Sequence, residues 1–338
     1  MEKFIIDQNE HVADLHNMIL TVDAHQDTLI PAFEKKQNIY DREGDGDSDI
    51  KRLLEGKIWA PIYALNVIKD TKNQRAKVYS QLKSALKLIS YIYQQLSITK
   101  KAKIAKNVND IIENKKDGLI SIILSIEGGE ALEGDLDLLY IFYQLGVRCI
   151  GLTHTERNEI ADSTNENRTG GGLTNFGVDL IKKMNMMGVV IDLAHISQAC
   201  FYDVLSISKK PVIVSHANVY SLCKNNRNLT DEQIIELAKN GGVLGISFCP
   251  FFLKPDGNAS VDDVIDHIDY VVKLVGDEHV GVGSDYDGLP QGINPAKKLE
   301  QSSYFPVLTK SLLLRGYSQN QIVRILGGNF IRVFKKVW

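Results

Sequence analysis

The 338-residue sequence has few cysteines and arranges none of them as a metal-binding or redox pair. Cys149, Cys200, Cys223 and Cys249 form no Cys-x-x-Cys motif, so we expect buried reduced thiols, not a disulfide framework or a thiolate zinc site. A run of about 18 apolar residues, the length of a membrane-spanning helix, is also missing. The first residues turn charged at once and show no signal-peptide core. These absences favour a cytoplasmic protein without a membrane partner.

An excess of one charge is likewise missing. Lys and Arg total 39 against 42 for Asp and Glu, which gives a net charge of -3. Without a basic surplus we expect no nucleic-acid partner, and without a polybasic segment no membrane-surface binding. The 44% hydrophobic and 24% charged residues are typical of a globular protein and exclude a disordered or collagen-like chain.

Short apolar runs alternate with amphipathic stretches along the chain. Eight runs are expected to be strands: Ile19–Val22, Trp59–Val67, Leu119–Ile126, Val147–Leu152, Val189–Leu193, Val212–Val214, Val243–Phe248 and Val280–Gly283. Helical spacing of apolar residues predicts helices over 78–96, 179–187, 231–239 and 261–274, with Thr230 as the cap of the third. The alternation predicts an α/β fold, a (β/α)8 TIM-like barrel that forms a single domain over residues 1–338. A doubly wound sheet is the alternative, although neither GxGxxG nor GxxxxGK[ST] follows any run.

Residues 41–49 read DREGDGDSD and resemble a fragment of a calcium loop. The full twelve-residue pattern with its final Glu is not met, so we interpret the segment as a solvated loop after the first strand.

Polar residues gather where the expected strands end, which is where a barrel builds its active site. His25 and Asp27 lie two residues apart and point the same way from an extended segment. Glu127 follows the third expected strand. His154, His195, His216 and Asp285 follow later strands. Four of the eight histidines thus meet Asp27, Glu127 and Asp285 on one rim.

This convergence predicts a metal site, although each histidine alone would more often be structural. Imidazole and carboxylate ligands without thiolate suit a catalytic zinc or a similar divalent ion. Five candidate ligands (His25, Asp27, Glu127, His195 and His216) exceed the needs of one tetrahedral ion with an open position, so we expect two ions with Glu127 as the bridge. The alternatives are Glu127 as a carboxylate at a helix amino terminus and Asp285 as a turn residue. Asp287 competes with Asp285, while Asp23 and Asp192 are expected to orient ligands.

Longer segments identify the chain as similar to a known family. They are VDAHQD (22–27), LSIEGGEAL (124–132), LTHTERNEIADS (152–163), GLTNFGVDLIKKMNMMGVVIDLAHIS (172–197), VIVSHANVYSLCKNNRNLTDE (212–232), GVGSDYDGLP (281–290) and GYSQNQIVRILGGNFIRVF (316–334). Together and in this order they resemble the membrane (renal) dipeptidase family of zinc peptidases, with its bacterial cytoplasmic members.

The resemblance implies a metal-dependent hydrolase barrel that carries two Zn²⁺ per chain and cleaves dipeptides with a hydroxide that bridges the ions. His25 and Asp27 would hold one zinc, His195 and His216 the other, and Glu127 would bridge them. Asp285 would bond the bridging water and transfer protons, and His154 would face the substrate. Arg227 would bind the substrate's terminal carboxylate. Ala24, Gln26 and Ala194 depart from residues common in the family, and segments 41–49 and 69–117 match it least.

Two rival functions stay open from the sequence. One is another metal-dependent amidohydrolase, although those often carry His-x-His after the first strand, where this chain has His25-x-Asp27. The other is a non-catalytic metal-binding barrel. The sequence leaves undetermined the preferred side chains, the configuration of the second residue, the native metal and the physiological substrate. A homodimer is a family expectation only.

Overall fold

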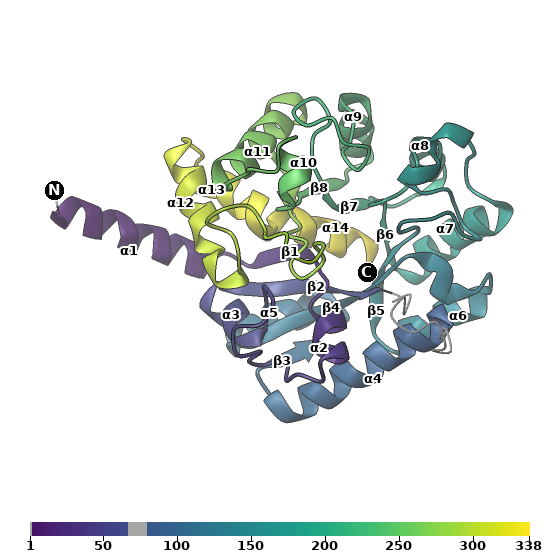
Figure 1. Ribbon diagram of the computed structural model, residues 1–338, viewed down its shortest axis with the longest axis horizontal. Helices are drawn as coiled ribbons and strands as arrows, with labels where there is room; N and C mark the ends of the chain where they lie inside the picture. The colour runs from purple at the N-terminus through teal and green to yellow at the C-terminus, as the bar shows by residue number, and fades with distance from the viewer. Residues whose placement is uncertain (1, 67–79) are drawn as a thin grey trace.

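The computed structural model describes residues 2–66 and 80–338, and side chains from residue 10 onward. Eight parallel strands follow one another in the order β1-β2-β4-β5-β6-β7-β8-β9, with helices between them (Figure 1). They are β1 Thr21–Gln26, β2 Ile58–Asn66, β4 Ile120–Glu127, β5 Val147–Gly151, β6 Val190–Asp192, β7 Ile213–Ala217, β8 Val243–Ile246 and β9 Val280–Val282. A short strand, β3 Ala102–Ile104, pairs only with β4.

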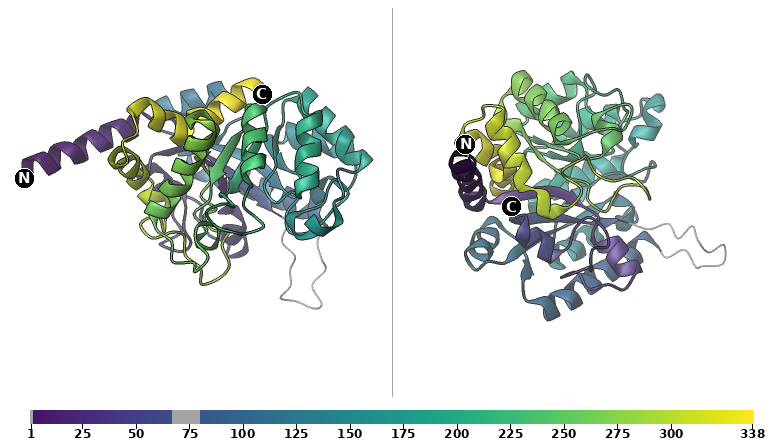
Figure 2. Two further views of the ribbon diagram at one scale, coloured as in Figure 1. Left: turned by 90° about the horizontal axis from the view of Figure 1, so that it is seen from above. Right: turned by 60° about the vertical axis from the view of Figure 1, so that its left-hand side comes forward.

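Helices surround the strands on the outside of the ring (Figures 1 and 2). They are α1 Glu2–Met18, α2 Leu29–Glu34, α3 Ile50–Glu55, α4 Gln81–Thr99, α5 Val108–Lys116, α6 Leu136–Gln144, α7 Asn175–Met187, α8 Gln198–Ile207, α9 Asp231–Lys239, α10 Pro250–Leu253, α11 Val261–Val275, α12 Pro306–Leu314, α13 Gln319–Val323 and α14 Asn329–Val337. Helix α1 projects from the body toward the amino terminus (Figure 2). Within the described residues, no helix combines the length and the apolar character needed to cross a bilayer.

The ring closes between its first and last strands at the carboxyl end of the strands. The backbone N–H of Asp27 donates to the carbonyl of Tyr286 at 2.9 Å, and that of Asp285 donates to the carbonyl of His25 at 3.1 Å. The result is a nearly closed parallel barrel with alternating strands and helices, which confirms the predicted (β/α)8 architecture.

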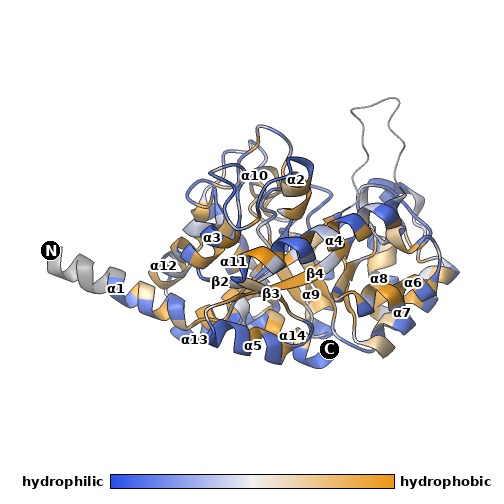
Figure 3. Ribbon diagram, turned by 90° about the horizontal axis from the view of Figure 1, so that it is seen from below, coloured by the Kyte–Doolittle hydropathy of each residue, from blue (hydrophilic) through white to orange (hydrophobic). Residues whose placement is uncertain are grey.

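The core explains why the apolar runs form strands. All eight residues of β4 are buried, and the labelled strands β2, β3 and β4 are mostly hydrophobic while the outer helices carry hydrophilic bands (Figure 3). Glycine is required at position 283, because a Cβ there would collide with the backbone oxygen of Ser215. The four cysteines are buried and free, as expected.

All eight strands differ from their predicted ranges by at least one residue, and two of them continue three or four residues beyond the predicted end. Strand β1 is Thr21–Gln26, not 19–22, and β7, the sixth strand of the ring, is Ile213–Ala217, not 212–214. In both cases the strand continues through buried polar residues that apolar periodicity does not mark. His25 and His216 therefore lie inside strands rather than after them.

The predicted helix bounds are described next. Helix α9 has the predicted bounds, and Thr230 caps it in a reciprocal capping box with Gln233. Helix α7 begins four residues earlier than predicted, at Asn175, with Thr174 as its cap. Val67 and Val78, which the predictions included in a strand and a helix, lie outside the described residues.

The interpretation of segment 41–49 as a solvated loop was wrong for three of its nine residues. Arg42, Ser48 and Asp49 are buried, and Asp49 caps helix α3 by accepting from the N–H of Arg52. Arg42 forms a 2.7 Å ion pair with Asp287, which lies 245 positions later in the chain. The segment is therefore packed against the loop that follows β9.

Candidate active site

One carboxylate oxygen lies at the centre of the predicted metal site. Glu127 ends β4, and its Oε1 is 3.1 Å from Nε2 of His195, 3.4 Å from Nε2 of His25 and 3.6 Å from Nε2 of His216. These four residues come from four strand ends, because parallel strands of a barrel present their carboxyl ends on one rim. The structure thus brings together residues that are up to 191 positions apart.

Two imidazoles face each other across this centre. The Nε2 atoms of His195 and His216 are 2.9 Å apart. Burial, with the nearby charge of Arg227, lowers the pKa of His195 to about 3. Burial and the charges of His25 and Arg227 hold the pKa of His216 well below its ordinary value. Both rings are therefore neutral near pH 7, which is the form that binds metal.

The remaining charges of the cluster balance one another. Burial disfavours a charged His25 ring, but Glu127 and Asp27 outweigh it and hold the pKa of His25 well above its ordinary value. Burial also opposes the Glu127 charge, yet His25 and His195 keep the pKa of Glu127 well below its usual range. Burial, reinforced by Glu127, raises the pKa of Asp27. His25 thus offsets negative charge of Glu127 and Asp27, a role that a bound divalent cation would also fill.

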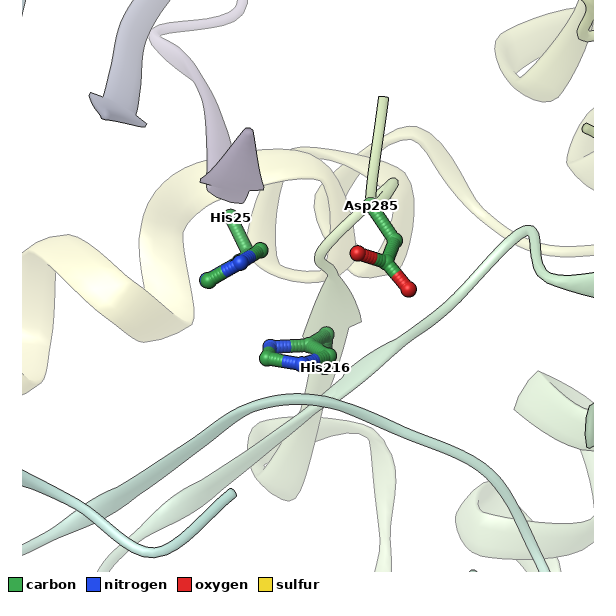
Figure 4. A group of neighbouring side chains, drawn as sticks. All are labelled: His25, His216 and Asp285. Carbon is green, nitrogen blue, oxygen red and sulfur yellow. The ribbon is translucent and has the colours of Figure 1, made fainter. Parts of the chain in front are cut away.

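The donor set fits divalent metal. The Oδ1 atom of Asp27 is buried and has no hydrogen-bond partner in the described part of the chain, so it is an acceptor that a cation would satisfy. Three overlapping groups bring candidate ligand atoms within 4.8 Å of one another: His25, Asp27 and Glu127; Glu127, His154 and His195; His25, His216 and Asp285. In the last group the side chains from β1, β7 and the segment after β9 lie around a common space (Figure 4). Imidazole and carboxylate donors without thiolate are typical of catalytic zinc.

Asp23 and Asp192 hold the backbone on which the ligands sit. Asp23 accepts from the N–H and hydroxyl of Ser284 at 2.7 and 2.6 Å, which ties β1 to the segment after β9. Asp192 accepts from the N–H of Ser215 at 2.8 Å and of Ala194 at 3.0 Å. Each bond lies next to a candidate ligand or to Asp285. The expected orienting role would therefore act through the backbone rather than through the imidazole rings.

Asp285 and Asp287 lie in different surroundings. Asp285 belongs to the candidate metal group with His25 and His216, and burial raises its pKa to about 7 despite the opposing charge of His25. A carboxyl group poised near neutrality suits proton transfer. Asp287 instead accepts from Arg42, from Thr28 Oγ1 at 2.9 Å and from the N–H of Asp47 at 2.9 Å. Both aspartates adopt positive φ, 68° and 64°, which turns the chain sharply at the rim.

His154 lies within reach of the candidate metal ligands. It forms a candidate group with Glu127 and His195, its Nδ1 is 2.9 Å from Thr155 Oγ1, and its ring centroid is 4.6 Å from that of His195. The side chain of Asn66 donates to Glu127 Oε2 at 2.9 Å and lies 3.4 Å from His154 Nε2. Sequence reasoning missed Asn66, although it is a polar residue at the end of an expected strand, the same signal that identified the others.

Arg227 and Asn66 line the same cavity. The cavity has a volume of about 430 Å³ and is lined by Asp27, Glu127, His154, His195, His216, Arg227 and Asp285 together with the apolar side chains of Phe251, Phe252 and Ile293. The Arg227 guanidinium lies 5.5 Å from the Phe252 ring centre and donates to the His216 carbonyl at 3.3 Å. No carboxylate pairs with Arg227 in residues 10–66 and 80–338. It is a cation in the cavity wall available to an anionic ligand.

Comparison with known proteins places this rim in a family. Residues 9–338 match the family model described as Membrane dipeptidase (Peptidase family M19). The dipeptidase aclJ of Aspergillus oryzae is 34% identical over 99% of this chain and 82% of its own length. The chain belongs to the membrane dipeptidase family. It is therefore a hydrolase of peptide bonds, and the resemblance inferred from the sequence is confirmed.

Other members and solved structures agree with this assignment. Dipeptidase 3 of Homo sapiens is 30% identical over 94% of this chain and 64% of its own. A metallo peptidase from Rhodobacter sphaeroides, crystallised with a phosphinate mimic of the dipeptide L-Ala-D-Ala, has a TM-score of 0.84 and 25% identity, and the match covers 95% of this chain and 99% of that one. The probable dipeptidase PvdM of Pseudomonas aeruginosa shares the fold, with a TM-score of 0.87 at 23% identity over 98% of both chains.

Proposed function

We propose that this chain is a zinc-dependent dipeptidase that uses two metal ions, and that residues 1–338 form one catalytic barrel domain. The observation that carries the proposal is the convergence of three imidazole nitrogens on Glu127 Oε1. The guanidinium of Arg227, which forms no ion pair with any described residue, lies on the wall of the same cavity. His25 and Asp27 would hold one ion, His195 and His216 the other, and Glu127 would bridge them. This membrane dipeptidase family member would act on free dipeptides.

Two divalent ions bound there would lower the pKa of a shared water and polarise the substrate carbonyl. Residues of the chain would transfer the protons and stabilise the developing negative charge. Asp285 takes the proton of the attacking water on its carboxylate and returns it to the leaving amine, a role that its pKa of about 7 allows. His154 donates a hydrogen bond to the oxygen that gains charge as the carbonyl is attacked. No covalent intermediate is required.

Arg227 sets the length of the substrate. A guanidinium binds a carboxylate through two parallel hydrogen bonds, so the free carboxyl terminus of a dipeptide is its natural partner. The distance from Arg227 to the cluster is fixed by the barrel rim. A longer peptide would place its carboxylate beyond Arg227.

The test of the two-metal proposal is Glu127→Gln, which keeps the shape of the side chain but removes its charge. We expect loss of at least one metal and a fall in dipeptide hydrolysis of two or more orders of magnitude, since even residues that only support ligands cost about 10–100-fold. Metal content by mass spectrometry and dipeptide hydrolysis are measured together, with exposed Glu133→Gln as the control. Two metals and wild-type activity in Glu127→Gln would contradict the proposal.

A further inference from the structure

The carboxylates of Asp27 and Asp285 lie beside each other at the turn that follows β9. The backbone N–H of Asp285 donates to the carbonyl of His25, and the N–H of Gly288 donates to the carbonyl of Asp285, both at 3.1 Å. A Cβ atom at position 288 would collide with Oδ2 of Asp27 and with Oδ1 of Asp285. Both carboxylates therefore pack against this glycine, and the course of the turn sets the position of the Asp285 carboxylate relative to Asp27.

The backbone of this turn has a conformation that needs support from its neighbours. Asp285 and Asp287 have φ of 68° and 64°, and Tyr286 between them is fully buried. The left-handed region is unfavourable for a residue with a Cβ, although aspartate tolerates it better than most. Two such residues within three positions persist only where the surrounding structure holds them. The contacts of Asp287 show what holds this turn.

Segment 41–49 binds both the side chain and the backbone of Asp287. Its Oδ2 accepts from Nη1 of Arg42 at 2.7 Å, and its Oδ1 accepts from the N–H of Asp47 at 2.9 Å. In return, the N–H of Asp287 donates to Oδ2 of Asp47 at 2.9 Å. The side chains of Arg42 and Asp287 are only 1% and 3% exposed, so their attraction is screened little by solvent. These bonds fix the orientation of Asp287 from two sides.

The Arg42–Asp287 ion pair is also connected to the candidate ligand Asp27. Thr28, the next residue in the chain, donates through Oγ1 to Oδ2 of Asp287 at 2.9 Å. The Thr28 side chain makes no capping bond to helix α2, which follows it. Glycine is required at position 46, because a Cβ there would collide with Oδ1 of Asp287 and with the Arg42 guanidinium. The ion pair thus joins segment 41–49, the residue after Asp27 and the turn after β9.

We propose that Asp287 is a positioning residue for peptide hydrolysis: held by Arg42 and Thr28, it fixes the turn that places the Asp285 carboxylate beside the candidate metal ligands. This inference rests on the proposed proton-transfer role of Asp285 and adds a residue that acts through it. A displacement of a reacting group by about 1 Å costs roughly 10²-fold in rate. The bonds of Asp287 therefore serve the rate of the chemical step rather than the binding of the substrate.

The experiment is a double-mutant cycle on the zinc-loaded enzyme with Asp287→Asn, Asp285→Asn and both substitutions together. Asparagine at position 287 keeps the shape but removes the charge that Arg42 binds. We expect Asp287→Asn to retain the wild-type metal content, to lower kcat for a dipeptide about 10- to 100-fold and to leave KM within about threefold. On the Asp285→Asn background the same substitution should change the residual kcat less than about twofold, because Asp287 acts only through Asp285.

Two further variants separate positioning from a loss of folded protein. Thr28→Val removes one donor to Asp287 and preserves the ion pair with Arg42, so the fold is retained even where Asp287→Asn fails to fold. It should lower kcat about two- to tenfold without a change in KM, as the loss of one hydrogen bond implies. Asp41→Asn, which breaks the exposed ion pair of Asp41 with Lys51 in the same segment, is the matched control and should change neither kcat nor KM.

Three kinetic results would overturn the inference. They are a kcat of Asp287→Asn within about twofold of the wild type, an equal fall in kcat on the wild-type and Asp285→Asn backgrounds, and a loss of metal or a rise in KM that accounts for the lost activity. A crystal structure of Asp287→Asn tests the inference without turnover. The Asp285 carboxylate should be displaced by about 1 Å or more from its wild-type position, and an unmoved carboxylate would also overturn the inference. Absence of dipeptide hydrolysis by the wild type would instead reject the proposed function.

Discussion

In the proposed function, Arg227 is the residue whose chemistry decides which peptides the site accepts. Capping a dipeptide as its carboxyl-terminal amide would remove the negative charge that the guanidinium is proposed to bind. We expect kcat/KM of the wild type to fall by roughly 10²-fold or more on the amide, since a lost charged hydrogen bond costs about 1.5–3 kcal/mol and leaves a charge unpaired. Steady-state kinetics on the acid and amide forms of one dipeptide measure this.

Variants of Arg227 supply the control for that measurement. Arg227→Ala should slow hydrolysis of the free dipeptide and erase most of the discrimination against the amide. Arg227→Lys should recover only part of it, because an ammonium group lacks the planar fork. Equal wild-type rates on acid and amide would reject the role of Arg227 and reopen the substrate class.

The variant His154→Ala tests whether His154 is a metal ligand. If its ring serves the substrate, His154→Ala should retain both metals and lower kcat by an amount that corresponds to about 2.7–4 kcal/mol, as the loss of one oxyanion donor does. Its proximity to Glu127 and His195 makes a ligand role the competing interpretation. Metal content of the variant decides: loss of an ion would place His154 among the ligands.

At the scale of elements, segment 41–49 fixes the loop after β9. Arg42 and Asp287 are both buried, so Arg42→Met leaves the Asp287 charge without its main partner. We expect a loss of about 3–5 kcal/mol in the free energy of unfolding, measured with urea. Lys35→Met, which breaks the exposed Lys35–Asp45 pair, is the control and should cost less than about 1 kcal/mol. Similar losses for both variants would contradict the anchoring role of Arg42.

The same elements show what the sequence could and could not predict. Apolar runs identified the strands of the ring because these strands are buried on both faces. They misplaced the ends of β1 and β7, where Asp23, Gln26 and His216 continue the strand as buried polar residues. Strand β3 was missed because only one of its three residues is buried.

The site was predictable wherever a polar residue follows an apolar run. This rule located Glu127, His195 and Asp285, which the structure brings to one rim. It could not show that Asp287 pairs with Arg42, because a contact between residues 245 positions apart leaves no local pattern.

At the scale of the whole molecule, two buried histidines outside the site connect distant elements. His16 of α1 lies 2.9 Å through Nε2 from the carbonyl of Gly56 and 2.7 Å through Nδ1 from Thr309 Oγ1. His267 of α11 lies 3.0 Å from the N–H of Val219 and 3.1 Å from the carbonyl of Leu253. Burial lowers the pKa of both below the ordinary 6.5.

These histidines predict acid sensitivity. Below pH 6.5 the unfolded chain takes up protons that the folded chain resists, so stability falls as the pH decreases; above pH 6.5 both states are neutral and the effect vanishes. Each histidine contributes up to roughly 1.4 kcal/mol per pH unit. We expect His16→Gln to weaken the pH dependence of urea unfolding between pH 6.5 and 5.5. A slope equal to that of the wild type would contradict this.

Because the ring closes at the rim between β1 and the segment after β9, the active site can form only late in folding. The predicted ligands begin at His25. Asp285, the proposed proton-transfer residue, and the carbonyl of Tyr286, which joins the last strand to the first, lie near the other end of the chain. A ribosome must therefore synthesise most of the protein before the rim can exist. Partly folded intermediates that lack the contact between β9 and β1 would contain much native secondary structure but no functioning centre. Recovery of activity during refolding would therefore follow the slowest, longest-range step of folding rather than the formation of helices.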